Sequence, residues 1–240
     1  MSFTPEYKKL KRTGLFPAFF IGGIPAAAVP VLNMAFRSQM YIGINASPVS
    51  ILLNANWQMM SMLNILLILS CACIMYHTEY ADNAMQKMCT LPIKESAIFF
   101  GKTAVMIAMA VMMLALEMIS IFFCALYWFA PSAELCVEIL KNFGFFLLLT
   151  LPAILLSLLI ASLCKNIWIS LGIGVVCMFL ATMIPRQNFL LTLFPFALPF
   201  QTIAECGIGE ITHYAIACAL ESAVISLLEI AILKIRRWFA

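Results

Sequence analysis

Charged residues are scarce in this chain of 240 residues: they make up 10% of it, whereas hydrophobic residues make up 64%. A soluble globular domain usually carries about 25% charged residues. No stretch of the sequence is polar enough to form a separate water-soluble domain. The composition therefore excludes a soluble protein and indicates a single membrane domain that covers residues 1–240.

Aspartate and histidine are also nearly absent. The one aspartate is Asp82, and the two histidines, His77 and His213, are predicted to lie on opposite faces of the membrane. The sequence has no His-Glu-x-x-His pattern that could bind zinc. No serine has a histidine within reach that could act as its catalytic base. We expect that this chain is not an enzyme and that it binds no metal or cofactor itself.

The sequence has instead six apolar runs that approach the roughly 20 residues an α-helix needs to cross a bilayer. The fifth run is the shortest, and Gly172 and Gly174 within it would let a neighbouring helix approach closely. We therefore expect an all-α membrane protein with six transmembrane helices. These runs occupy Leu15–Phe36, Trp57–Tyr76, Thr103–Phe129, Ile139–Leu163, Ile167–Ile184 and Tyr214–Leu233.

The basic residues favour one orientation of these helices. If the N-terminus is cytoplasmic, only Arg37, Lys141 and Arg186 of the 14 Lys and Arg residues lie on or near the outside. Both termini are therefore predicted to be cytoplasmic. Because the basic residues sit at membrane boundaries, they indicate contact with anionic lipid and not with nucleic acid. No cleavable signal peptide is expected, since the polar N-terminal segment continues directly into a full-length span.

Three segments outside the spans have features of their own. Residues 1–14 alternate basic and apolar side chains and predict an interfacial elbow helix on the inner membrane surface. Residues Arg37–Asn56 predict a polar external loop. Residues 185–212 predict a longer extracellular loop, whose apolar run Phe189–Phe200 is too short and too proline-broken to span the membrane. This run is expected to be a re-entrant or interfacial segment, which either gates an exit or only caps the helix bundle.

Most of the nine cysteines lie inside apolar runs, where they are expected to be buried and inert. Cys71 and Cys73 are two residues apart on a predicted helix and point to different faces, so they make a poor metal pair. Cys136 and Cys206 both fall in predicted external segments. A disulfide bond between these two is a possibility that the sequence leaves open.

Residues 77–102 form the longest polar interruption and lie between the second and third runs. Within them, apolar residues recur at three- and four-residue spacing, which predicts an amphipathic helix that Asp82 caps and Pro92 ends. Two spanning helices would hold this helix at the membrane face as a rigid lever, with one side free to fit a groove on a cytoplasmic partner. The alternative is an interfacial helix that lies only on lipid.

Two short segments resemble a known family. The order of Glu79, Asn83, the CTLPIKES stretch with Leu91 and Pro92, and then Gly101-Lys102 resembles the loop between the second and third helices of ABC-2 type transporter permeases. The N-terminal EYKKLKRT, Glu6–Thr13, resembles the opening of the permease subunits of lantibiotic immunity and bacteriocin export systems.

The resemblance implies an export permease that pairs with a second permease, identical or related, and binds two cytoplasmic ATPase subunits, which bind ATP and Mg²⁺. ATP-driven closure of the ATPase pair would then rotate the permease halves from an inward-facing to an outward-facing state. The coupling helix of the family maps onto about Glu79–Leu91. The residues expected to contact the ATPase are Glu79, Asn83, Met85, Lys87, Met88, Leu91 and Pro92.

Gly101-Lys102-Thr103 is similar to the end of a phosphate-binding loop, but the first glycine of that motif would have to stand at position 96, which is Ser96. No strand is predicted before it. Lys102 is instead expected to snorkel from the membrane boundary to the lipid headgroups. ATP binding is therefore expected in another chain.

Glu117, Glu221 and Glu229 are the charged residues left inside predicted spans. A bare carboxylate at the bilayer centre costs at least about 2.5 kcal/mol, so such residues tend to face a bundle interior, a wet cavity or a partner subunit. We treat them as candidates for the substrate pathway. The alternatives are that Glu229 pairs with Lys234 or Arg236, and that Glu117 and Glu221 are protonated or hydrogen-bonded between helices.

These features together predict a multi-pass permease of a bacterial plasma membrane that expels lantibiotic-like antimicrobial peptides and so confers immunity. Acidic groups on the pathway would suit a cationic peptide. One alternative keeps the exporter but changes its cargo to a drug, a lipid or a polysaccharide precursor. The other makes the chain a non-transporting membrane scaffold or sensor, whose loop recruits a signalling partner.

Overall fold

The computed structural model describes residues 15–81, 95–129, 134–185, 189–204, 206 and 208–239. Throughout these ranges the regular elements are helices, and no strand occurs. The prediction of an all-α protein is confirmed. The elements are α2 (Leu15–Tyr41), α3 (Pro48–Ala81), α5 (Glu95–Trp128), α6 (Leu135–Leu163), α7 (Ile167–Met183), α8 (Phe189–Thr192), the 3₁₀ turn η1 (Leu198–Phe200) and α9 (Ile208–Phe239).

Five of these helices are long and apolar enough to cross a membrane, namely α2, α3, α5, α6 and α9. Helix α7 is apolar but has only 17 residues, which is slightly short of the about 20 that a bilayer requires. The chain is therefore a multi-pass membrane protein, and its described residues include five long helices and one shorter apolar helix.

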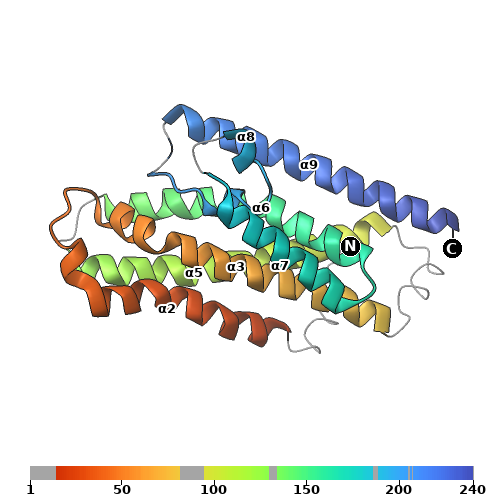
Figure 1. Cartoon of the computed structure of the whole chain (residues 1–240), viewed down its shortest axis with the longest axis horizontal. Coiled ribbons are helices and arrows are strands. Elements are labelled where there is room, and N and C mark those ends of the chain that lie inside the picture. The colour runs from red at the N-terminus through yellow and green to blue at the C-terminus, as the bar shows by residue number, and fades with distance from the viewer. Residues whose placement is uncertain are drawn as a thin grey trace.

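The helices run antiparallel along one long axis, and α9 crosses one face of the bundle obliquely (Figure 1). Helix α3 is central, since it packs against α2, α5, α6 and α7, while α9 packs mainly on α6. The start of α2 and the end of α9 lie at the same end of the bundle, together with the end of α3 and the start of α5. We call this the loop end of the bundle.

Helix α7 approaches α3 closely at a glycine. A β-carbon added at Gly174 would overlap the side chain of Leu69, whereas one added at Gly172 would meet no atom within 4 Å. The predicted close helix approach is therefore confirmed for Gly174, while Gly172 makes no such contact.

The predicted bounds of the external loop, Arg37–Asn56, are too wide, because α3 already begins at Pro48. The first helix does leave helical geometry at Arg37 (φ −135°, ψ 24°), but helical backbone resumes after this kink and α2 ends at Tyr41. Proline suits the first turn of a helix, where its missing N–H group would have no partner. Asn56, which suggested a loop, is buried and is satisfied inside the bundle: its Nδ2 donates to the Leu52 carbonyl (2.8 Å), and its Oδ1 accepts from Asn33 (2.7 Å).

The cysteines inside the predicted apolar runs were expected to be buried. Cys71, Cys73, Cys124 and Cys218 are buried, whereas Cys164 and Cys177 are partly exposed. The structure contains no disulfide bond between Cys136 and Cys206. Cys136 is exposed to the surroundings of the bundle. No group of three or more His, Cys, Asp or Glu residues that could hold a metal occurs among the described residues.

Candidate functional site

Several buried polar side chains interrupt the apolar interior, and two sets of them include a glutamate enclosed by other helices. The first lies near the loop end of the bundle and consists of the buried Tyr76, Lys102, Ser162 and Glu229 with the partly buried Tyr80, which we call the loop-end cluster. The second lies nearer the middle of α3 and α5 and consists of Asn64 and Glu117, which we call the mid-bundle pair.

Glu229 of α9 is the acidic member of the loop-end cluster, and its side chain is 0% exposed. Its Oε2 accepts a hydrogen bond from the Ser162 hydroxyl of α6 (3.0 Å), and its Oε1 accepts one from the Tyr76 hydroxyl of α3 (3.4 Å). Tyr80, one helical turn beyond Tyr76, donates its hydroxyl to the Ser162 carbonyl (2.5 Å). These bonds join three helices that are far apart in the sequence.

Lys102 of α5 is the basic member of the cluster and is 2% exposed. Its Nζ lies over the ring of Tyr76, 4.9 Å from the ring centroid, in the geometry of a cation–π contact. The prediction that Lys102 snorkels to the headgroups is therefore wrong. The side chain is turned into the bundle, where an aromatic face and neighbouring polar groups replace water.

Residues Gly101-Lys102-Thr103 lie within α5, six or more residues after its start at Glu95. The Thr103 hydroxyl donates to the Phe99 carbonyl (3.0 Å) of the preceding turn. Backbone N–H groups in a helix interior are already hydrogen-bonded, so they cannot surround a phosphate as those of a phosphate-binding loop do.

The loop-end cluster lies beside both ends of the predicted coupling segment, because α3 ends at Ala81 and α5 begins at Glu95. Glu79 falls within α3. The remaining predicted ATPase contacts lie outside the described residues; they are Asn83, Met85, Lys87, Met88, Leu91 and Pro92.

Three members of the loop-end cluster were not among the predicted functional residues, namely Tyr76, Tyr80 and Ser162. The two tyrosines are four residues apart, which places both on one face of a helix. Two aromatic hydroxyls on one face at the end of an apolar run are a signal for a buried polar contact. Ser162 offered no comparable signal, because a lone serine in an apolar run usually bonds to its own helix.

The mid-bundle pair links α3 and α5 directly. Glu117 is 0% exposed and Asn64 is 4% exposed. The Asn64 Nδ2 donates to Glu117 Oε2 (3.1 Å), while Glu117 Oε1 and Asn64 Oδ1 are buried without a hydrogen-bond partner. The third predicted glutamate, Glu221 of α9, is half-buried, and its Oε2 also lacks a hydrogen-bond partner. The three glutamates thus occupy three different environments.

The apolar run Phe189–Phe200 packs on the opposite part of the bundle. The Pro199 carbonyl accepts two hydrogen bonds from α3, from Trp57 Nε1 and from the Ser61 hydroxyl, each at 2.9 Å. The Trp57 ring also stacks on Phe146 of α6, with ring centroids 3.5 Å apart. The run is therefore fixed to the first half of α3, away from the loop end of the bundle. Its buried residues include Phe196, Leu198, Pro199 and Phe200.

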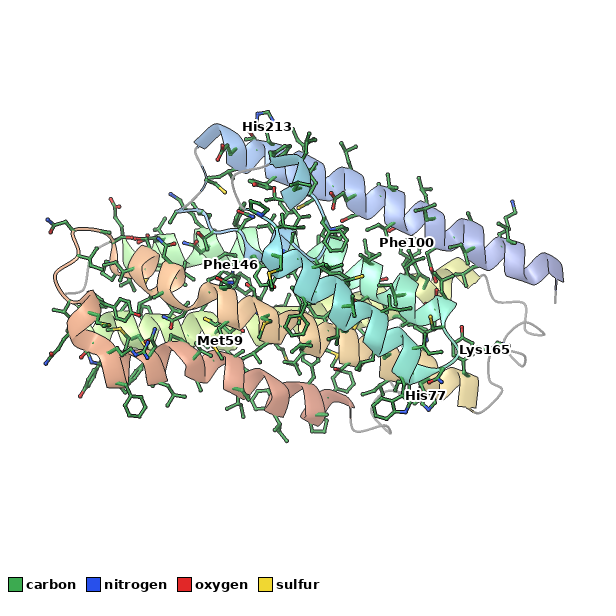
Figure 2. The ribbon with its side chains drawn as sticks, in the orientation of Figure 1. Met59, His77, Phe100, Phe146, Lys165 and His213 are labelled. Atoms are coloured by element: carbon green, nitrogen blue, oxygen red, sulfur yellow. The ribbon has the colours of Figure 1, made fainter. Side chains whose placement is uncertain are left out.

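The two histidines do not come together. His77 lies near the loop end of the bundle, as does Lys165, while His213 lies near the start of α9, away from both (Figure 2). The structure thus agrees with the prediction that His77 and His213 cannot share one site.

The family model of the ABC-2 family transporter proteins matches residues 3–181, which is most of the chain. The chain belongs to this family. Membership makes this ABC-2 protein a transmembrane transport component, of a kind that generally works with a cytoplasmic ATPase partner. No curated protein and no solved structure matches the chain. The family match ends at Ala181, so α9, with Glu221 and Glu229, lies beyond the matched residues of this ABC-2 protein.

Proposed function

We propose that this ABC-2 protein is the permease subunit of an ATP-driven exporter, and that its coupling segment, about Glu79–Leu91, docks on a cytoplasmic ATPase. The observation that carries this proposal is the loop-end cluster. It joins the end of α3 and the start of α5, which flank the segment, to α6 and α9.

The cluster would act as a mechanical link. Removing one partner of a buried hydrogen bond costs about 1–3 kcal/mol when the other group is left unsatisfied. The ends of α3 and α5 therefore resist moving apart from α6 and α9. A displacement of the segment by the ATPase would be passed on to α6 and α9, as in a rigid-body transition between two packed states.

We place the loop end of the bundle in the cytoplasm of a bacterium, so that both termini are cytoplasmic. Lys165 lies at this end (Figure 2), and α9 carries Lys234 toward the same end. Arg37 lies near the other end of α2. This distribution agrees with an excess of basic residues on the cytoplasmic side of a plasma membrane.

We propose that the cargo is a cationic, amphipathic, lantibiotic-like peptide, on the strength of the N-terminal resemblance and of the intramembrane glutamates. Of the three pathway candidates, Glu221 is the best placed to meet a peptide. It lies on α9, of whose apolar stretch only 22% is buried inside the protein. Glu117 and Glu229 are enclosed by partners from other helices. A second permease, identical or related, would cover the exposed part of α9 and complete the pathway.

Co-purification of this chain with cytoplasmic ABC ATPases of the same organism tests the proposal. We expect the wild-type chain to form a stable complex in detergent, with ATP hydrolysis that depends on the permease. Met85→Glu and Glu79→Ala should lose assembly or stimulated hydrolysis. Glu229→Leu should retain assembly but lose stimulation, because it breaks the link and leaves the docking segment intact.

Leu190→Ala is the matched control, because Leu190 is 82% exposed on α8 and distant from the segment in the sequence. It should behave as wild type. The exporter assignment is overturned if no ATPase binds the wild-type chain, and the scaffold or sensor alternative then takes its place. If the complex forms but Glu221→Gln leaves peptide resistance unchanged, the peptide cargo is wrong, and a drug, lipid or polysaccharide precursor replaces it.

A further inference from the structure

The mid-bundle pair contains two oxygen atoms that no donor in the described part of the chain reaches. Glu117 Oε2 accepts from Asn64 Nδ2 (3.1 Å), but Glu117 Oε1 and Asn64 Oδ1 have no partner, although both atoms are buried. Both are acceptors on neighbouring planar groups. Buried acceptors without a donor are rare in folded proteins. A hydrogen atom between the two oxygens would satisfy both.

The surroundings do not supply this hydrogen. The hydroxyls three residues away on the same helices are used elsewhere: Ser61 donates to the Pro199 carbonyl, and Ser120 donates to the Ala27 carbonyl. The buried side chains one turn before and after the pair on the two helices are apolar, and they include Met60, Ile68, Met113, Leu114 and Ile121. Among the described residues, no group of three or more His, Cys, Asp or Glu side chains could hold a metal ion here.

We propose that the pair is a proton-binding site, in which Glu117 carries a proton on Oε1 and donates it to Asn64 Oδ1. The carboxylic acid and the amide then face each other through two hydrogen bonds and close a ring. A single proton satisfies both unpaired oxygens and removes the charge of Glu117. The reverse orientation of the amide would set Oδ1 against Oε2 and would require a proton there as well.

An ionised Glu117 would leave both oxygens unsatisfied and would hold a bare charge among apolar helices. Each unsatisfied buried acceptor costs about 1–3 kcal/mol, and the charge adds several kcal/mol. A neutral acid avoids both penalties. The protonated pair therefore fastens α3 to α5 within the membrane, and these are the two helices on either side of the coupling segment. Glu117 is then not an anionic contact for cargo in this state of the bundle.

Infrared difference spectroscopy of the full chain in lipid nanodiscs at pH 7 tests this proposal. The wild-type spectrum should contain a C=O band of a protonated carboxyl group that shifts in D₂O, and the spectrum of Glu117→Gln should lack this band. Loss of carboxylate stretching bands would overturn it. Neither outcome depends on an ATPase or on cargo, so failure here is distinct from failure of the proposed exporter function.

Thermal unfolding of matched variants gives a second readout. Glu117→Gln keeps two hydrogen bonds to Asn64 and should unfold near the wild-type temperature, whereas Glu117→Leu and Asn64→Leu should unfold several degrees lower. If Glu117→Gln is as unstable as Glu117→Leu, the charge is required and the proposal fails. It also fails if NaCl, compared with choline chloride, stabilises the wild type but not Glu117→Gln, since the pair would then bind sodium.

Discussion

Lys102 and Glu229 show how strongly the meaning of a charged residue depends on its neighbours inside a membrane bundle. Both lie near the ends of apolar helices, where water and headgroups are close, yet both are enclosed. Tyr76 serves both, because its ring faces the Lys102 ammonium while its hydroxyl donates to Glu229. A tyrosine at this position therefore connects a cation and an anion that belong to different helices.

Two replacements of Glu229 should distinguish the contribution of its charge to stability from that of its hydrogen bonds. Glu229→Leu removes one acceptor from the Tyr76 hydroxyl and one from the Ser162 hydroxyl, which also lies 2.9 Å from the Leu159 carbonyl. The loss of these bonds is expected to cost about 1–3 kcal/mol. Glu229→Gln keeps an acceptor oxygen and should cost less. Thermal unfolding in detergent measures both. Leu228→Ala is the control, since Leu228 is half-exposed on the same helix and should change little. Equal stability of Glu229→Leu and wild type would show that the cluster does not hold the helices.

At the scale of elements, α7 has only 17 residues, so the thickness of the bilayer does not determine its position. Its position depends instead on close packing against α3. Gly174 allows α7 to lie against Leu69 of α3. The N-terminus of α7 is also fixed locally, because the Asn166 side chain accepts a hydrogen bond from the Trp168 backbone N–H (2.9 Å) and caps the helix. A cap and one close approach together place this short helix.

Substitution at the two glycines of α7 should therefore have unequal effects. Gly174→Leu should destabilise the fold by forcing α7 away from Leu69, whereas Gly172→Leu extends into open space and should be tolerated. Unfolding temperatures of the two variants check this. Leu69→Ala combined with Gly174→Leu should recover part of the loss, because it vacates the space that the new side chain needs. Similar losses at both glycines would contradict the proposed packing.

The helices themselves were predictable, because long apolar runs in a bilayer permit little other than helices. Their ends were not. Asn56 suggested a loop, but its amide is satisfied by Leu52 and Asn33, so α3 extends past it. The partners of Glu229 were equally hidden, since Tyr76 and Ser162 lie 153 and 67 residues away. Which face of a helix turns inward depends on packing, and hydropathy alone does not determine it.

At the scale of the whole molecule, different contacts hold the helices together at the two ends of the bundle. The loop end gathers the ends of α3, α5, α6 and α9 around charged and hydroxyl groups. The other end is fixed by the run Phe189–Phe200, whose Pro199 carbonyl binds α3 through Trp57 and Ser61. Thr192 of α8 adds a hydrogen bond to Tyr214 of α9 (3.1 Å). A movement that begins at the loop end would thus reach this segment through α3 and α9.

Cys136 offers a direct test of the orientation of the whole molecule. It is an exposed thiol at the start of α6, at the end of the bundle that we place outside the cell. A membrane-impermeant maleimide should therefore label it in intact cells, and Cys136→Ser should lose that labelling. Labelling of Cys136 only after the cells are permeabilised would reverse the orientation and place the loop end outside.

The loop-end cluster also has a consequence for biogenesis. Helix α9 is synthesised after α3 and α6, and it brings the Glu229 carboxyl group into a bilayer that offers no solvation for it. By then α3 and α6, which carry the Tyr76 and Ser162 hydroxyls that donate to Glu229, have already been synthesised. Lateral release of α9 from the insertion machinery is therefore favourable once the earlier helices have assembled. A chain whose α3 and α6 are misassembled would retain α9 at the membrane surface, where quality-control proteases recognise incomplete proteins.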